Sequence, residues 1–434
     1  YSSSDFLINL IAGDLAISKS ITSHANYDPR VPNYFINQFI YGADINHNFP
    51  GFNYGLSILS VEEDSRDVHH SLSNFRFEKN YSAGDVYLSF VRKDSEKKDF
   101  DENIQGSGFY LSNTNFFENW SITTAYRSMK MDINDPNIRH NQSDNFGNAL
   151  DIQRSPTGYY LHTFRLLSRT SQEVNLNDEI GIELQITGPL NEDNIVAINY
   201  LKSSSTKDWY QNWNGDWLSK KNSTFPSSKY SSYPYEETYL EFSGYSSSGD
   251  IYYKTGIDFQ NKVFNVLTNG PEFQSFEVSK SQTFPFLLSF KTNSQWSYDV
   301  QFEYQKLKTG FKRTTISDVD GIDNLYSFHS LLSKKEQINR FISFSANYNK
   351  SWTFNFSFET TNADESKLND NTNDNFDSSN SWESIGVSYK FDSDDTLQLF
   401  YGSVRGGLDC TNGVCRYVQA FEDGLRIDYT SNLN

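Results

Sequence analysis

The sequence predicts an all-β protein: an antiparallel transmembrane β-barrel of about 18 strands, within a range of roughly 14 to 22. Three observations predict this fold. Many segments alternate apolar with polar residues, aromatic residues are abundant, and short connections alternate with long ones. Each alternating segment has about ten residues, the length that a tilted strand needs to cross a bilayer. We expect short periplasmic turns, long extracellular loops and a location in the bacterial outer membrane.

The alternation is clearest between Trp296 and Gln305. One face carries Trp296, Tyr298, Val300, Phe302 and Tyr304, and the other face carries only polar residues. A strand of this kind has one face in lipid and one in water. The segments 180–186 and 251–259 repeat the pattern. The residues that we expect to face the lumen are Asp299, Gln301, Glu303, Glu183 and Asp258.

The composition agrees with a barrel. Aromatic residues make up 16% of the chain, with 28 Tyr and 35 Phe, whereas hydrophobic residues reach only 36%. Half of each barrel strand faces a polar lumen, and aromatic residues gather at the two membrane interfaces. The formal net charge of −18 disfavours a nucleic-acid partner, which would require a basic surface. Membrane lipid is the partner that this pattern implies.

The connections divide into two groups. Short turns are expected near Pro50-Gly51, Asn80, Glu118, Pro189-Leu190, Ser248, Ser294, Lys350 and Asp394. Long polar stretches are expected at 18–32, 95–105, 131–177, 206–234, 309–336 and 364–380. We treat residues 1–434 as one barrel domain whose last segment, 424–430, is the closing strand. The stretch 131–177 is a loop, an extra strand pair or a plug folded into the barrel mouth, because Tyr159, Tyr160 and Phe164 are too apolar for a free loop.

Two cysteines lie close together near the C-terminus. Asn412-Gly413 is a tight-turn dipeptide that would bring Cys410 and Cys415 together. We predict a disulfide, which implies an oxidising compartment. Two reduced thiols in a loop are the alternative.

The same region carries a family resemblance. Residues 405–416 read R-G-G-L-D-C-T-N-G-V-C-R and follow Leu397, Leu399, Phe400, Tyr401 and Gly402. This ending resembles that of an uncharacterised, Bacteroidetes-type family of outer-membrane β-barrel proteins. The resemblance implies a surface location and further strands upstream of Gly13-Asp14, so that Tyr1 would not be the mature N-terminus. Arg405 and Arg416 either pin this loop against acidic lumen residues or are solvated at the rim.

Two loops are candidate binding sites. Asp318, Asp320 and Asp323 surround Gly321 in an oxygen-rich loop that could hold calcium, although a solvated acidic loop is the simpler interpretation. No other cofactor is expected. Trp209, Tyr210, Trp213 and Trp217 lie in the stretch 206–234. Aromatic side chains gathered in an exposed loop favour contact with a protein partner or a glycan. A loop folded into the lumen is the alternative.

The motifs of common hydrolases are not found in the sequence, which has neither G-x-S-x-G nor H-E-x-x-H. We therefore expect a protein that is not an enzyme. A channel for small solutes or cations is the first hypothesis, because acidic lumen residues favour cations. A scaffold that anchors or assembles with other cell-surface or periplasmic proteins is the second. A secreted glycan-binding β-protein is the third.

Overall fold

The structure is a computed structural model of the chain. The residues that it describes are 5–18, 35–63, 67–97, 102–133, 136, 150, 160, 162–170, 172, 174–211, 216–221, 224–264, 273–316, 325–333, 336–349, 351–362, 380–391, 395–411, 414–418 and 421–431. The proposed calcium ligands Asp318, Asp320 and Asp323 lie outside these residues, as does Trp213.

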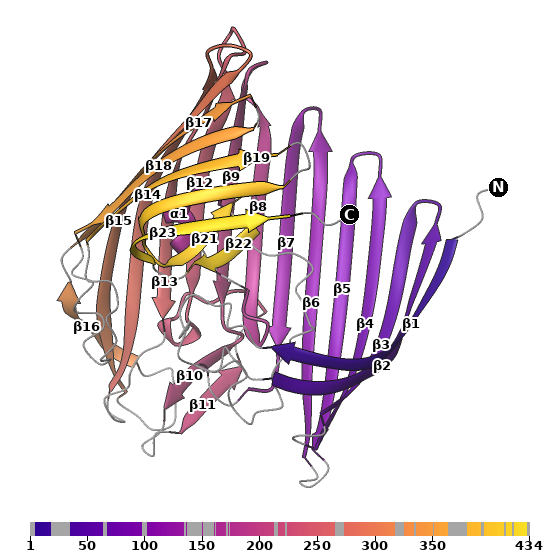
Figure 1. Ribbon diagram of the computed structural model, residues 1–434. Helices are drawn as coiled ribbons and strands as arrows, with labels where there is room; N and C mark the ends of the chain where they lie inside the picture. Colours follow the sequence, from indigo (N-terminus) through magenta and orange to yellow (C-terminus); the bar gives the residue numbers. More distant parts are fainter. Residues whose placement is uncertain are drawn as a thin grey trace.

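One large antiparallel sheet dominates the fold, and its strands pair in the order in which they follow one another along the chain (Figure 1). The first half consists of β1 (Asp5–Ser18), β2 (Phe35–Phe49), β3 (Phe52–Glu63), β4 (Val68–Tyr81), β5 (Gly84–Lys97), β6 (Glu102–Phe117), β7 (Trp120–Lys130), β8 (Asp178–Pro189) and β9 (Asn194–Ser204). The second half consists of β12 (Tyr235–Tyr245), β13 (Ile251–Phe264), β14 (Phe273–Lys291), β15 (Trp296–Ile316), β17 (Gln337–Tyr348), β18 (Trp352–Thr361), β19 (Ser381–Lys390), β20 (Thr396–Val404) and β23 (Phe421–Thr430). This sheet confirms the predicted fold, an antiparallel transmembrane β-barrel of about 18 strands.

A few short elements accompany the large sheet. The strand β16 (Leu325–Ser333) pairs with the last part of β15 and extends the sheet beyond the main wall. Two hairpins form separate small sheets: β10 (Lys207–Gln211) with β11 (Trp217–Lys221), and β21 (Gly407–Thr411) with β22 (Val414–Val418). Among the described residues, the helical elements are α1 (Arg165–Thr170) and the 3-10 turn η1 (Tyr230–Ser232). Within the described residues, no helix is long and apolar enough to cross a membrane.

The sheet curls around a central space, and its two edges are β1 and β23 (Figure 1). Among the described residues, β1 pairs with β2 and β23 pairs with β20, without hydrogen bonds between the two edges. The segment 424–430 is therefore the last strand, as expected, whereas its role in closing the barrel stays a prediction.

All eight predicted short turns connect neighbouring strands of the sheet. Gly51, at φ +94°, adopts the left-handed conformation between β2 and β3 that a tight turn needs. The predicted long stretch 95–105 is wrong, because β5 continues to Lys97 and β6 begins at Glu102. The predicted stretch 309–336 is also wrong in part, because β15 continues to Ile316 and β16 follows within it. Ser95 explains the first error: it is buried on the inner face of β5, where a polar residue continues a strand rather than ending it.

The outer face of the sheet is apolar. The register aligns Val300, Phe344, Phe356, Ile385, Tyr401 and Leu425 in one row across six consecutive strands. Phe344 and Phe356 remain 40% and 41% exposed. Side chains of this kind that point outward along a whole wall are suited to a lipid environment and not to water.

Aromatic pairs border the sheet next to the short turns. The ring centroids of Trp296 and Tyr348 are 4.7 Å apart, and those of Trp352 and Tyr389 are 4.6 Å apart. Phe49 and Phe52 stack at 5.0 Å on either side of the Pro50-Gly51 turn. Rings at this level form the kind of aromatic girdle that marks a membrane interface in barrel proteins.

Candidate functional site inside the barrel

The inner face of the sheet carries buried carboxylates. Alternation along β12 points Tyr235, Glu237, Tyr239 and Glu241 inward, and these four side chains are buried. Further inward carboxylates include Glu183 on β8, Asp258 on β13, Glu303 on β15 and Glu359 on β18, each at most 6% exposed. A carboxylate that is removed from water needs hydrogen bonds or an opposite charge. The hydrogen-bond donors and basic side chains that contact these carboxylates therefore identify the important contacts inside the barrel.

Part of the connection between β7 and β8 lies inside the curled sheet, where Figure 1 shows α1 behind β23. The helix contacts β14, β15 and β17 of the wall and the β21–β22 hairpin. Phe164 and Leu167 pack against Tyr239, and Leu150 packs against Ile40, Val61 and Leu72 of the strands near the other edge. The apolar residues of this connection are thus held against the wall, which is the physical reason for their presence in a polar stretch.

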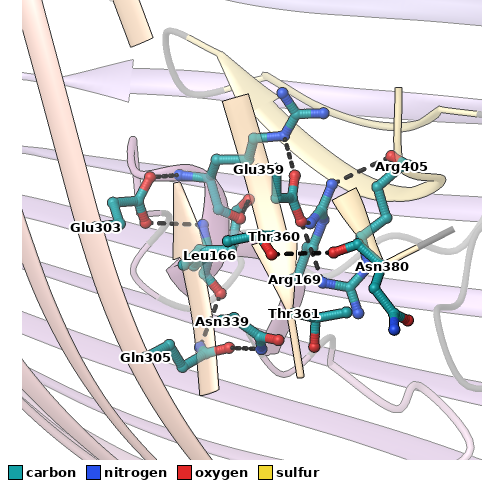
Figure 2. A network of polar contacts seen from close by, with 12 residues as sticks. Leu166, Arg169, Glu303, Gln305, Asn339, Glu359, Thr360, Thr361, Asn380 and Arg405 are labelled. Carbon is teal, nitrogen blue, oxygen red and sulfur yellow. Dashed lines mark hydrogen bonds and ion pairs between the residues drawn. The ribbon is translucent and has the colours of Figure 1, made fainter. Parts of the chain in front are cut away.

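Glu303 holds the beginning of α1. The backbone N–H of Arg165 donates to Glu303 Oε1 at 2.7 Å, and that of Leu166 donates to Oε2 at 2.8 Å (Figure 2). The first N–H groups of a helix have no partner within the helix, and a carboxylate there is favourable. Gln305, two residues along β15, donates to the carbonyl oxygen of Leu166 at 3.1 Å and accepts from Asn339 at 2.9 Å.

Glu359 is the meeting point of three arginines (Figure 2). Arg169 forms a short ion pair with Oε1, Arg405 Nη1 lies 3.1 Å from the same oxygen, and Arg165 Nε lies 3.4 Å from Oε2. Arg169 also donates to the backbone carbonyl of Arg405 at 3.1 Å. These contacts join α1, the wall strand β18 and Arg405, which lies two residues before the β21–β22 hairpin.

Aromatic rings of the wall complete this charged site. The guanidinium of Arg165 lies 5.1 Å from the ring centroid of Phe341, and that of Arg405 lies 5.0 Å from Trp382. The register places Phe341 and Trp382 on either side of Glu359. Each cation therefore lies between a carboxylate and an aromatic face, both of which stabilise positive charge. We name Glu303, Glu359, Arg165, Arg169 and Arg405 the anchor site.

The expected lumen residues fall into two groups. Glu303, Glu183 and Asp258 are buried. Glu303 binds α1, as described above. Glu183 forms an ion pair with Arg127 at 3.1 Å and accepts a hydrogen bond from the backbone N–H of Tyr160. Asp299 and Gln301 are half-buried on the same face of β15. Asp299 accepts a hydrogen bond from Ser289 at 2.5 Å, and Gln301 donates to Glu303 at 2.7 Å.

The expectation of an exposed aromatic loop is wrong for Trp209, which is 1% exposed. Its indole N–H donates to Asp178 Oδ2 at 2.8 Å, and its ring packs in a cluster with Met131 and Ile133. Trp217 packs partly buried against this cluster, and Tyr210 is also only half-buried. The ring of Trp209 thus stabilises the packing of β10 against the start of β8, and it is not available on the surface.

The C-terminal hairpin agrees with the predicted turn. Cys410 and Cys415 are opposite each other in the register of β21 and β22. Their side chains, and that of Arg416, lie outside the described part of the chain, so the disulfide and the role of Arg416 stay predictions. For Arg405, the contact with Glu359 favours the interpretation that it pins the loop against an acidic lumen residue.

Sequence reasoning missed Arg165, Arg169 and His162 as functional residues. All three lie in the connection 131–177, where no periodic pattern exists from which their neighbours could be read. One signal was available: the run from Arg165 to Arg169 brings two cations into an apolar stretch of an otherwise acidic protein. Such a run would suggest a segment that meets carboxylates.

Comparison with solved structures returns membrane proteins of low similarity. The copper transporter OprC matches with a TM-score of 0.39 at 8% identity, over 86% of this chain and 62% of that chain, so the chain spans less than two thirds of its length. OmpT, an outer membrane protein of Vibrio cholerae, gives 0.33 at 10% identity, over 98% of this chain and 94% of that one. OccAB3 of Acinetobacter baumannii gives 0.34 at 9% identity, over 93% of each chain.

A comparison with curated proteins finds no match. A family model, in contrast, covers most of the chain. It matches residues 37–433, from β2 to beyond the end of β23, and its description is a family of unknown function. This match agrees with the expectation of an uncharacterised family, while the Bacteroidetes-type origin and the C-terminal motif stay predictions. The chain belongs to the family DUF6029.

Proposed function

We propose that the protein is a bacterial outer-membrane barrel that acts as a channel for small solutes or cations, with the α1 segment as an internal gate. The apolar outer face and the aromatic girdle support the membrane location. The anchor site is the observation that carries the gate, because its ion pairs tie α1 to the barrel wall and to Arg405. Contacts of this kind can break and re-form without loss of the apolar wall.

The charge of the interior supports the choice of solute. Several inward carboxylates line the same wall, and the chain as a whole carries a net charge of −18. Acidic rings and walls favour cations over anions in pores. A cation or a neutral solute is therefore the substrate class that this interior suits.

Conductance measurements on Glu359→Gln test this function. The substitution keeps the size of the side chain and removes the charge that Arg165, Arg169 and Arg405 share. We expect small, cation-selective currents from the wild-type protein in planar bilayers and severalfold larger or longer openings from the variant. Glu336→Gln is the matched control, because Glu336 pairs with Lys306 and Lys308 and not with α1.

The channel is contradicted if folded wild-type protein and Glu359→Gln both give neither current nor solute flux at equal incorporation. Currents from Glu359→Gln that match those of the wild type and of Glu336→Gln would contradict the gate. The first of these results would favour the scaffold instead. That alternative has one observation in its favour: Leu218 on β11 and Phe225 beyond it are 41% and 64% exposed, as a surface for a protein partner would require.

A further inference from the structure

Three side chains that could bind a metal ion meet inside the barrel, on the wall beside the anchor site. His162 comes from the residues before α1, Glu237 from β12 and Asp258 from β13. One ligand atom from each lies within 4.8 Å of the others. The three residues are 2%, 3% and 0% exposed, so water does not compensate their charges.

The strand register explains how the two carboxylates come together. Tyr239 is opposite Asp258 and Glu237 is opposite Gln260 in the β12–β13 pair, so Glu237 and Asp258 are diagonal neighbours on the inner face. His162 is held above them by two rings: its ring centroid lies 4.7 Å from that of Tyr239 and 5.2 Å from that of Tyr160, both nearly perpendicular. The position of the imidazole is thus set by packing.

The carboxylates of this cluster have few partners. His162 Nε2 and the Tyr235 hydroxyl form short hydrogen bonds with Glu237. Neither oxygen of Asp258, nor Nδ1 of His162, has a hydrogen bond within the described residues. The side chain of Gln260 lies beside Asp258, and its amide nitrogen likewise has no hydrogen bond there. A buried carboxylate without partners among the described residues indicates that Asp258 binds a ligand.

The basic groups of the interior are paired elsewhere. Lys254 lies 2.8 Å from Glu241, and Arg127 pairs with Glu183. In the part of the chain that the structure describes, no lysine or arginine forms an ion pair with Glu237 or Asp258. Two buried carboxylates with one imidazole leave an excess of negative charge, which a divalent cation would neutralise.

We propose that His162, Glu237 and Asp258 form a binding site for a divalent first-row transition-metal ion. An imidazole with two carboxylates is a mixed nitrogen and oxygen ligand set, which suits zinc or manganese better than magnesium or calcium, which prefer oxygen alone. Atoms that are each about 2 Å from a common ion lie roughly 3 to 4 Å apart. The three ligand atoms lie within 4.8 Å of one another, so modest side-chain shifts would place them around one ion. Tyr235 orients Glu237 as an outer hydrogen-bonding partner.

The position of the site gives it a structural consequence. Two ligands belong to the wall and the third to the segment that leads into α1, so the ion ties this segment to the barrel. Binding requires only the folded chain and is independent of whether the barrel conducts. The result of the experiment below therefore does not depend on the proposed channel.

Zinc binding by the full chain in detergent tests the site. Protein treated with a chelator and dialysed is titrated with Zn²⁺ in a calorimeter, and the bound metal is counted by elemental analysis. We expect one tightly bound zinc per chain for the wild type and at least about tenfold weaker binding for Asp258→Asn. Asp299→Asn is the matched control, because Asp299 is also on the inner face but contacts the neutral Ser289 and Asn347; we expect it to bind like the wild type.

X-ray absorption of the zinc-loaded wild type keeps the test decisive if a variant does not fold. We expect one imidazole nitrogen together with carboxylate oxygens at about 2.0–2.2 Å. The proposal is overturned if the wild type binds no zinc, if Asp258→Asn binds as tightly as the wild type, or if the spectrum shows no imidazole. In those cases a proton shared between Glu237 and Asp258 would replace the metal.

Discussion

Glu359 shows how a single side chain can fix a segment inside the barrel. It is 2% exposed, and the three arginines that surround it are themselves largely shielded from water. Removing one partner of a buried ion pair costs about 3–5 kcal/mol, because the remaining charge is left uncompensated. The anchor site is therefore strong while it is intact and sensitive to the loss of one charge.

Glu303 offers the sharpest prediction for a single residue. Glu303→Gln removes the charge that accepts from the N–H groups of Arg165 and Leu166. Hydrogen bonds to a charged group contribute about 1.5–3 kcal/mol, so we expect amide hydrogen exchange in the peptide around 163–170 to rise by roughly tenfold to a hundredfold. Asp299→Asn, on the same strand, should leave it unchanged. Equal exchange in wild type and Glu303→Gln would show that Glu303 does not hold α1.

Sequence periodicity could predict the wall side of the candidate site but not the partner side. Glu303 and Asp258 could be assigned to the inner face because a strand points alternate residues to opposite sides. Arg169 and Glu359, in contrast, are separated by 190 residues, and no local pattern encodes such a contact. Trp209 was misjudged for a related reason: its partner Asp178 belongs to a different strand.

The strand β20 contains a constrained position at the element scale. Gly402 has φ +127°, and a Cβ atom there would lie 2.1 Å from the carbonyl oxygen of Glu383. The pairing of β20 with β23 shifts just beyond it, between Gly402 and Val404. A bulge with glycine at the strained position is a common way to bend a strand.

Gly402→Ala should therefore destabilise the last strand pair. A side chain in this backbone region costs about 1–3 kcal/mol, and we expect the free energy of unfolding in urea to fall by that amount. Gly386→Ala on the adjacent β19 is the control, since the nearest atom to its Cβ would be at 3.7 Å, an ordinary contact. The interpretation fails if the two variants unfold at the same urea concentration.

Turns were predictable where the chain has turn residues. Pro50-Gly51 and Asn349 lie at strand ends, and both Gly51 and Asn349 adopt positive φ. The 95–105 stretch was not predictable, because its polar residues resemble those of a loop although β5 continues to Lys97 and β6 begins at Glu102. The hairpin β21–β22 combines both cases: its Asn-Gly turn is visible in the sequence, but its contact with α1 is not.

At the scale of the whole molecule, the sheet is a meander of long strands with an apolar outer face and a polar inner face. The length of its strands and the alternation along them were enough to predict about 18 strands. The interior segment follows from a general requirement, since a wide barrel encloses space that either water or protein must fill. The segment of the chain that fills this space is determined by packing between residues that are distant in the sequence. The alternation of apolar and polar residues along a strand gives no information about such packing.

The account requires that the apolar face be in contact with the outer membrane. The most direct measurement is to separate the membranes of the native host, extract the outer-membrane fraction in mild detergent, and compare boiled with unboiled samples on a denaturing gel. A barrel with paired backbone groups resists detergent until it is heated. We expect the chain in the outer-membrane fraction and a change of mobility on boiling. A soluble chain whose mobility does not change would contradict the account.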